Sequence, residues 1–143
     1  MLAGIPSPNG LVLNLDETAV LLAVTRDNAV WRVPMMGDGT ATTVGMYIQM
    51  SGGGGPDGIA LDDTGGLAVC HVGFGAAWIF SPKGEPLYRI DSPEGLYTTN
   101  CAYGVPDGKR LYIVESRSGT ILAATLPTAG QPMYSHSAHA GVA

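Results

Sequence analysis

The strongest constraint on the fold of this chain is a short pattern that it repeats. Pro8-Asn9-Gly10 precedes Leu11-Val12-Leu13, and 48 residues later Pro56-Asp57-Gly58 precedes Ile59-Ala60-Leu61. Each copy places a short oxygen-bearing side chain between a proline and a glycine, just before a strand-like apolar run. A structural unit repeated in this way suggests oxygen ligands arranged around one axis.

Short apolar runs separated by turns predict an all-β fold. The 21 glycines and 10 prolines punctuate these runs, and no segment shows a helical period with caps. The runs form three groups of four. The expected strands are residues 11–15, 19–25, 29–34, 44–50, 59–62, 66–71, 76–81, 87–91, 100–103, 110–115, 120–126 and 133–137.

The spacing of the three groups favours a β-propeller. Trp31-Arg32-Val33 and Trp78-Ile79-Phe80 lie 47 residues apart, and a period in the forties with four strands per repeat is typical of propeller blades. We expect both tryptophans to be packing anchors between blades. The third repeat opens at Thr99-Asn100-Cys101, so we expect Asn100 to occupy the position of the Asn and Asp in the tripeptides.

The predicted fold is therefore one half-propeller domain over residues 1–143, with four-stranded blades at about 9–50, 57–92 and 99–138. Propellers typically close with about four to eight blades. An open arc of three blades would expose the apolar faces of its first and last blades, and such patches mark interfaces. We therefore expect a second chain to complete the ring, most simply as a homodimer.

Composition and charge exclude several other classes of protein. The net charge of −5 and only seven basic residues argue against binding to nucleic acid or to a membrane surface. No apolar run approaches the roughly 18–20 residues that span a bilayer, and the first residues do not resemble a signal peptide. Cys70 and Cys101 look like isolated, reduced thiols, so we expect a cytoplasmic protein.

The candidate site consists of Asn9, Asp57 and Asn100. The first strands of propeller blades line the axis, so these side chains would point into one funnel. Carboxylate and carboxamide oxygens suit calcium, magnesium or manganese. The alternative is an Asx-turn, in which the side chain bonds its own backbone, and the tripeptides alone leave both interpretations open.

Other polar residues have simpler interpretations. His71 ends an expected strand and reads as a loop or packing residue, although near the funnel it could contact substrate. Glu115 ends the equivalent strand of the third repeat and reads as an exposed charge on the rim. His136 and His139 read as residues of a Ser- and Ala-rich tail.

Three segments of the sequence resemble one known family. They are SPNGLVLNLDETAVLLAVTRDNAVWRV, GGGGPDGIALDDTGGLAVCHVGFGAAWIFSPKGE and TTNCAYGVPDGKRLYIVES, and they resemble gluconolactonase, regucalcin (senescence marker protein) and luciferin-regenerating enzyme. The resemblance covers nearly the whole chain but only the C-terminal half of the family. It implies half of a six-bladed propeller with a divalent metal in its central channel.

The resemblance also implies roles for individual residues. Asn9 looks like a metal ligand, Asp57 looks like a metal ligand and the catalytic base, and Asn100 falls in a Thr-Thr-Asn segment near the channel. The implied activity is metal-dependent hydrolysis of sugar lactones, with calcium first and magnesium, manganese or zinc as alternatives. The metal would polarise the lactone carbonyl. The family's first-blade Glu ligand and the substrate-binding Asn and Arg of its N-terminal half have no counterpart here.

Three hypotheses follow from the sequence. The first is a lactone hydrolase completed by dimerisation, in which the Asp57 of a second copy replaces the missing Glu. The second is a propeller fragment that binds a divalent metal or another ligand without catalysis. The third is that this chain is part of a longer protein.

Overall fold

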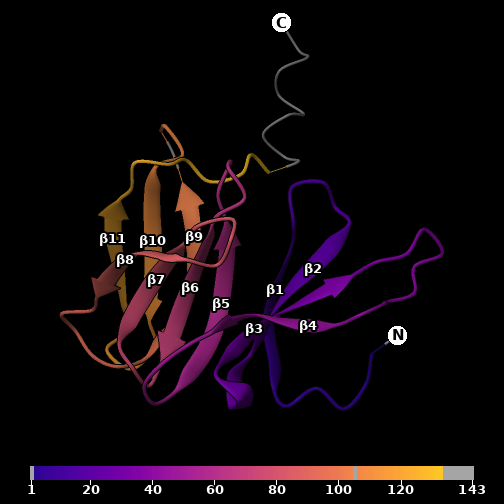
Figure 1. Ribbon diagram of the computed structural model, residues 1–143. Helices are drawn as coiled ribbons and strands as arrows, with labels where there is room; N and C mark the ends of the chain where they lie inside the picture. The colour runs from indigo at the N-terminus through magenta and orange to yellow at the C-terminus, as the bar shows by residue number, and fades with distance from the viewer. Residues whose placement is uncertain (1, 105, 134–143) are drawn as a thin grey trace, which may run out of the picture.

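The computed structural model describes residues 2–104 and 106–133, which form three antiparallel sheets (Figure 1). Sheet 1 contains β1 (Pro8–Leu13), β2 (Ala19–Val24), β3 (Ala29–Pro34) and β4 (Gly45–Gln49), with the short 3-10 helix η1 (Thr25–Asp27) between β2 and β3. Sheet 2 contains β5 (Gly55–Leu61), β6 (Leu67–Val72), β7 (Ala76–Phe80) and β8 (Pro86–Asp91). Sheet 3 contains β9 (Thr98–Gly104), β10 (Arg110–Glu115) and β11 (Thr120–Thr125). The all-β prediction is confirmed.

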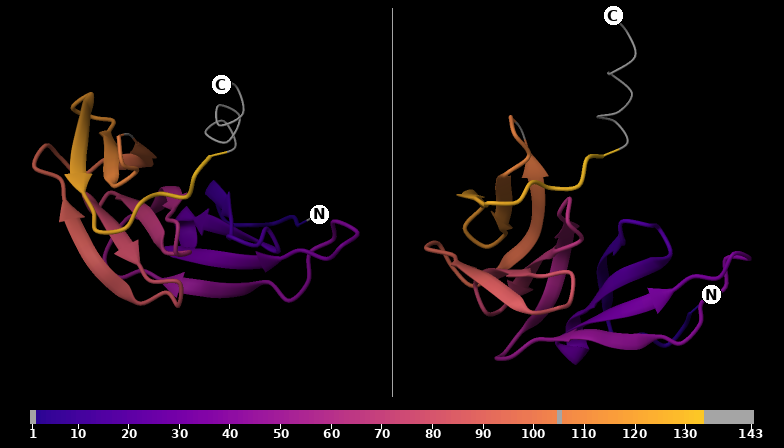
Figure 2. Two further views of the ribbon diagram at one scale, coloured as in Figure 1. Left: turned by 90° about the horizontal axis from the view of Figure 1, so that it is seen from above. Right: turned by 45° about the horizontal axis from the view of Figure 1, so that its top comes forward.

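The three sheets are arranged side by side in a propeller-like way (Figure 2). In each sheet the strands pair in chain order. The first strands are also neighbours, because β1 contacts β5 and β5 contacts β9. The starts of β1, β5 and β9 therefore meet along the inner edge of the three sheets.

The third sheet differs from the expected blade. It has three strands within the described residues, and Met133, the first residue of the expected twelfth strand, lies outside any strand. The rest of that expected strand, the end of the third expected blade, and His136 and His139 lie outside the described residues. Across residues 2–104 and 106–133 there is no helix long and apolar enough to cross a membrane.

The two tripeptides lie inside the inner strands, not before them. In β1, Pro8 pairs with Val24 and Leu11 pairs with Leu22, so Asn9 and Gly10 are opposite one residue. The same irregularity separates Pro56 and Ile59 in β5. Both copies are therefore β-bulges, which insert one extra residue and bend the strand locally.

The glycine of each tripeptide allows the inner strands to approach closely. A Cβ atom on Gly10 would lie 2.5 Å from the carbonyl oxygen of Asp57. A Cβ atom on Gly58 would lie 2.7 Å from the Cα atom of Asn100. Because both neighbours are held in the next sheet, a side chain at either glycine would push the sheets apart.

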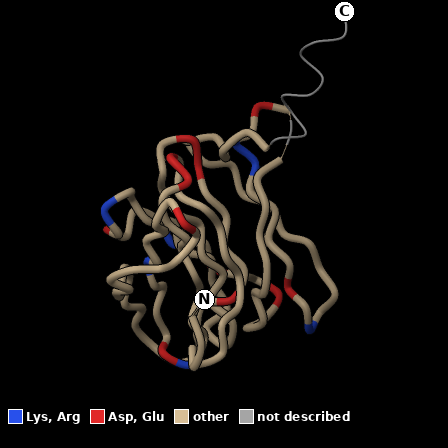
Figure 3. Tube along the Cα trace, turned by 90° about the vertical axis from the view of Figure 1, so that its right-hand side faces the viewer, with Lys and Arg blue, Asp and Glu red and all other residues tan. Residues whose placement is uncertain are grey.

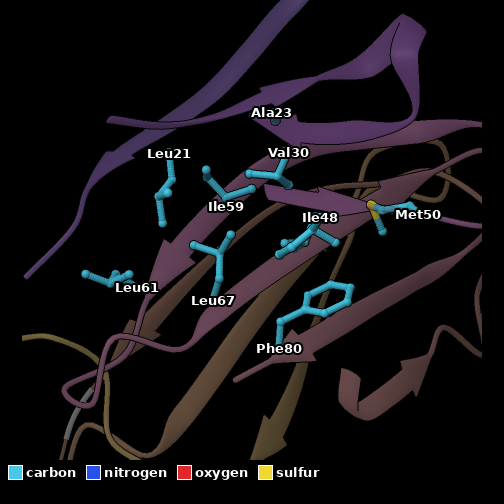
Figure 4. Packing of buried hydrophobic residues seen from close by; sticks show 10 residues of the cluster. Leu21, Ala23, Val30, Ile48, Met50, Ile59, Leu61, Leu67 and Phe80 are labelled. Carbon is cyan, nitrogen blue, oxygen red and sulfur yellow. The ribbon is translucent and has the colours of Figure 1, made fainter. Parts of the chain in front are cut away.

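Two apolar clusters hold the sheets together. The first joins sheets 1 and 2 (Figure 4) and consists of Leu21, Ala23, Val30, Ile48, Met50, Ile59, Leu61, Leu67, Val69 and Phe80. The second joins sheets 2 and 3 and consists of Ala68, Cys70, Ala77, Ile79, Cys101, Leu111, Ile113 and Leu126. Sheet 2 contributes to both clusters, with one face packed on each neighbour.

The two tryptophans occupy equivalent positions but differ in their surroundings. Trp31 pairs with Leu22 and Trp78 pairs with Val69 on the second strands of their sheets. Trp78 packs against the first cluster, as expected of a packing anchor. Trp31 follows the cluster residue Val30, and successive side chains of a strand point to opposite faces. It therefore lies on the face of sheet 1 that is turned away from sheet 2.

The cysteines are not isolated, contrary to the expectation from sequence. Cys70 and Cys101 are both buried free thiols in the second cluster. The pKa of Cys70 is raised by its hydrogen bond with Cys101 and by burial. Thiols in such apolar surroundings behave as small hydrophobic residues.

Charged residues are sparse on this fold. Figure 3 shows Lys and Arg at separate places along the trace, not gathered in one region. One ion pair, between Arg89 and Asp91 on β8, is found within the described part of the chain. Apolar packing and backbone pairing, rather than ion pairs, hold these sheets together.

The close approach at Gly58 can be tested by a stability measurement. We expect Gly58→Ala to lower the free energy of unfolding by about 1–3 kcal/mol, the usual cost of overpacking, because the new methyl group meets the backbone of Asn100. Urea denaturation followed by tryptophan fluorescence measures the change. The control is Gly37→Ala, where a Cβ atom meets nothing within 4 Å. Equal stability of the two variants would contradict the close approach.

Candidate functional site

The structure brings Asn9, Asp57 and Asn100 to the adjoining starts of the three inner strands. Asn9 lies on β1, Asp57 on β5 and Asn100 on β9. The Asn9 side chain lies close enough to Asp57 to lower the pKa of its carboxyl group, and the side-chain oxygen of Asn100 lies against Gly58. Asn9 and Asn100 are exposed and Asp57 is partly buried, and the Asn100 side-chain oxygen accepts a hydrogen bond from the backbone N–H of Cys101 at 3.0 Å.

Asp57 is the carboxylate of this cluster. Burial raises its pKa above the ordinary value for an aspartate, while the nearby Asn9 side chain opposes that shift. A carboxylate with a raised pKa is a stronger proton acceptor than an exposed one. It also gains more from a nearby cation, because a positive charge relieves the unfavourable burial of its own charge.

A residue that the sequence analysis missed holds Asn9 in place. The Nδ2 group of Asn9 donates to the hydroxyl of Thr25 at 3.3 Å, and that hydroxyl donates to the carbonyl oxygen of Pro56 at 2.8 Å. Thr25 lies 16 residues from Asn9 along the chain. No spacing rule connects these positions, so only the fold could reveal the contact.

The pairing of β9 with β10 shows that Asn100 is one residue away from the position equivalent to Asn9 and Asp57. Thr98 pairs with Glu115 and Asn100 pairs with Val114, so Thr99 is the extra residue of the bulge in β9. Thr99 therefore corresponds to Asn9 and Asp57, and Asn100 stands where the other two strands have glycine. Its side chain fills the space that Gly58 leaves open.

The donor chemistry of the cluster fits a hard divalent cation in part. One carboxylate and two carboxamide groups supply the oxygen ligands that such cations prefer. Over residues 2–104 and 106–133, no three His, Cys, Asp or Glu side chains come together in a metal-binding group. Asn9, Asp57 and Asn100 could thus provide part of a coordination shell, with further oxygen atoms needed from water, substrate or another chain.

A mostly apolar hollow of about 240 Å³ lies further along the inner strands. Ile59, Ala60 and Leu61 of β5 and Cys101, Ala102 and Tyr103 of β9 form much of its lining. It begins two residues beyond Asp57 on β5. The oxygen-bearing cluster therefore lies at one end of a concave surface formed by the inner strands.

His71 is enclosed and does not join the cluster. It has no exposed surface, stacks on Phe74 at 4.8 Å between ring centroids, and accepts a hydrogen bond from Trp78 Nε1 at Nδ1 over 3.3 Å. Burial lowers its pKa, which favours the neutral ring. These contacts agree with a packing role, and a contact between His71 and substrate stays a prediction.

Glu115 is not the exposed rim charge expected from the sequence. It has no exposed surface, and its carboxylate accepts hydrogen bonds from the backbone N–H groups of Tyr97 at 2.8 Å and Ser118 at 2.6 Å. The pKa of Glu115 is lowered first by the Ser118 side chain and then by these backbone N–H groups, that of Ser118 before that of Tyr97. Glu115 fastens the chain before β9 to the turn after β10, which is a structural role.

The comparisons with known proteins agree with this architecture. The profile of the SMP-30/gluconolactonase/LRE-like region matches residues 1–117. The chain belongs to this family. Its relatives include a gluconolactonase of Zymomonas mobilis, 31% identical over 126 residues, and a 6-deoxy-6-sulfogluconolactonase of Pseudomonas putida, 31% identical over 111 residues.

The chain is much shorter than these relatives. The matches cover 81% and 76% of this chain but only 34% and 38% of the two curated proteins. A solved structure of regucalcin from Agrobacterium tumefaciens, described as a calcium-binding protein, superimposes with a TM-score of 0.74 at 25% identity. That match covers 89% of this chain and 49% of the regucalcin chain. The chain thus spans between a third and a half of the family members it matches.

The structural role of Glu115 predicts a specific pH dependence. A lowered pKa in the folded state means that the carboxylate stabilises the fold above its ordinary value of 4.5, and that this contribution is lost as the pH falls through the folded-state value. We expect Glu115→Gln to be less stable than the unmodified protein at neutral pH. The difference should shrink progressively below about pH 4.5, as the unmodified carboxylate becomes protonated.

Urea unfolding midpoints between about pH 3 and pH 7 measure this difference. Glu94→Gln, at an exposed carboxylate before β9, provides the control and should change stability little at any pH. A Glu115→Gln variant that matches the unmodified protein at neutral pH would show that the carboxylate is not needed to hold the two loops.

Proposed function

We propose that this chain is part of a gluconolactonase-like hydrolase of sugar lactones that depends on a divalent metal ion. The observation that carries the proposal is the meeting of Asn9, Asp57 and Asn100 at the starts of three inner strands, in a chain of the gluconolactonase family. Two of its relatives are named as lactonases and a third as a calcium-binding protein. Calcium is therefore the first candidate, and magnesium, manganese and zinc are the alternatives.

The proposed reaction is the opening of an aldonolactone by water. Asp57 accepts a proton from the attacking water, and its raised pKa suits it to that task. The carbonyl carbon gains the hydroxyl group, the ring C–O bond breaks, and the released alkoxide takes up a proton to give the open hydroxy acid. Asn9 and Asn100 orient substrate or cation through their carboxamide groups. A bound cation would supply positive charge to the developing oxyanion.

We further propose that a second copy of the chain completes the ring. Within the described part of the chain, sheets 1 and 3 each have one face that no other sheet covers, and both faces carry exposed apolar side chains. On sheet 1 these are Leu11 and Leu13, and on sheet 3 they are Tyr112, Val114 and Ile121. Two copies of a chain that covers 49% of a regucalcin chain amount to about one full-length relative. A two-fold axis would place each sheet 3 against the partner's sheet 1.

Such a dimer would also supply what the single chain lacks. One carboxylate belongs to the cluster in each copy, and a shared channel would hold the two Asp57 side chains together with their amide neighbours. Among the described residues, the cluster of one chain contains one carboxylate, that of Asp57. This observation favours the second candidate function, which is binding of a divalent metal or another ligand without catalysis.

Substitution of Asp57 distinguishes the two functions. We expect Asp57→Asn to reduce kcat/KM for aldonolactones by at least about 100-fold, because a general base typically contributes about 10²–10⁴-fold. A pH-indicator assay with a panel of aldonolactones, in the presence of Ca²⁺, Mg²⁺, Mn²⁺ or Zn²⁺, measures the rate. Asp38→Asn, in the exposed loop between β3 and β4, should retain full activity.

Two outcomes would contradict the proposal, the first for the role of Asp57 and the second for the lactonase activity itself. Undiminished turnover in Asp57→Asn would remove Asp57 from the mechanism. An unmodified protein that hydrolyses no lactone, yet loses metal affinity in Asp57→Asn, would establish the binding function instead.

Ring closure predicts the mass in solution. We expect light scattering to give twice the chain mass of 14.7 kDa. Ile121→Glu should convert the dimer to a monomer, because Ile121 is 69% exposed and a charge there would have to be buried in the interface. Met36→Glu, in the loop between β3 and β4 and 52% exposed, is the control and should stay dimeric. A monomeric unmodified protein would overturn ring closure by a second copy.

A further inference from the structure

Thr25 occupies the seam between sheets 1 and 2, next to both candidate ligands. It begins η1, immediately after β2. Its backbone N–H donates to the carbonyl oxygen of Ser7 at 3.1 Å, and Ser7 lies two residues before Asn9. Its hydroxyl donates to the carbonyl oxygen of Pro56 at 2.8 Å, in the peptide unit that leads into Asp57. One residue thus fixes the chain just before each of the two ligands.

The seam is too tight for Thr25 to move freely. A Cβ atom on Gly55 would collide with the carbonyl oxygen of Thr25, so β5 passes directly over this residue. The backbone of η1 is fixed as well, because the N–H of Asn28 donates to the same carbonyl oxygen at 3.1 Å. The Thr25 hydroxyl is therefore held at one place relative to both inner strands.

The direction of these hydrogen bonds decides how the Asn9 side chain is presented. A hydroxyl has one hydrogen to donate, and Thr25 uses it for the carbonyl oxygen of Pro56. Only its lone pairs remain for Asn9, so Asn9 must turn its NH₂ group toward Thr25, as observed at 3.3 Å. The carboxamide oxygen of Asn9 then has no hydrogen-bond partner among residues 2–104 and 106–133. An oxygen atom, and not an NH₂ group, is what a cation requires from an asparagine.

We propose that Thr25 is the positioning residue of this site: it orients the Asn9 oxygen for a ligand and holds Asp57 in register beside it. This inference rests on the proposed function for the identity of the ligand, a divalent cation. The hydrogen-bond geometry around Thr25 does not depend on that function, because it involves only residues of this chain. Partners that orient metal ligands in this way are typically worth about 10–100-fold in metal affinity.

The chain contains a chemically matched control. In the turn between β1 and β2, the Thr18 hydroxyl also accepts from an asparagine, Asn14 Nδ2 at 3.3 Å, and donates to an oxygen, Asp16 Oδ1 at 2.7 Å. This turn lies at the opposite end of β1 from Asn9. Thr18→Val therefore removes the same kind of hydroxyl with the same pattern of hydrogen bonds, away from the cluster.

The first measurement is the dissociation constant for Ca²⁺ by isothermal titration calorimetry. We expect Thr25→Val, which keeps the shape of the side chain but removes the hydroxyl, to weaken binding by at least about 10-fold. Thr25→Ser restores the hydroxyl and should bind within about threefold of the unmodified protein. Thr18→Val should bind equally well. Equal affinity in Thr25→Val and in the unmodified protein would overturn the proposal.

The second measurement needs no metal and separates this inference from the proposed function. In the metal-free protein, the ¹H–¹⁵N signals of the Asn9 side-chain amide should shift and exchange faster with water in Thr25→Val, but not in Thr25→Ser or Thr18→Val. If the unmodified protein binds no Ca²⁺, the proposed calcium site is wrong. The Asn9 signals alone then decide whether Thr25 orients the Asn9 side chain. Unchanged Asn9 signals in a folded Thr25→Val variant would overturn it, and urea denaturation verifies that the variant is folded.

Discussion

The close approach of the three inner strands is the constraint on which the rest of this structure depends. Gly10 and Gly58 have no side chain at the points where β1 meets β5 and β5 meets β9. Because the strands come this near, the apolar faces of neighbouring sheets can close into two clusters. The same approach brings the oxygen-bearing side chains of three different sheets within reach of one another.

The glycines thus link the packing of the sheets to the chemistry of the site. In each tripeptide the middle residue carries an oxygen to the inner edge, and the glycine makes room for the next strand. Thr25 adds a hydrogen-bonded connection between the first two sheets at the same level. Folding and ligand presentation therefore depend on the same few residues at the starts of the inner strands.

Much of the fold could be predicted because it has local signals. Apolar alternation and turn residues located the strands, and the equivalence of Trp31 and Trp78 follows directly from their spacing. The errors arose where the decisive contacts are distant in sequence. The bulge in β9 is defined by its pairing with β10, so Asn100 was aligned one residue away from its structural equivalent. The sequence suggested that Glu115 is exposed, because its hydrogen-bond donors are backbone N–H groups of two separate loops, and no sequence pattern shows that these loops meet at its carboxylate. Thr25 carries no motif at all.

The bulges have a consequence for how this sequence can change. Side chains alternate between the two faces of a strand, so each surplus residue reverses the phase of everything that follows it. The oxygen-bearing residue can then project at the inner edge while Val12 and Ile59 still turn toward the apolar cluster. Removing one residue from a tripeptide would restore a regular ladder in which Leu11 still pairs with Leu22, but the strand would lose the bend and the extra position at the inner edge. Substitutions at Asn9 or Asp57 change one candidate ligand, whereas a single deletion there would remove the bulge that provides a place for both the oxygen-bearing residue and the glycine.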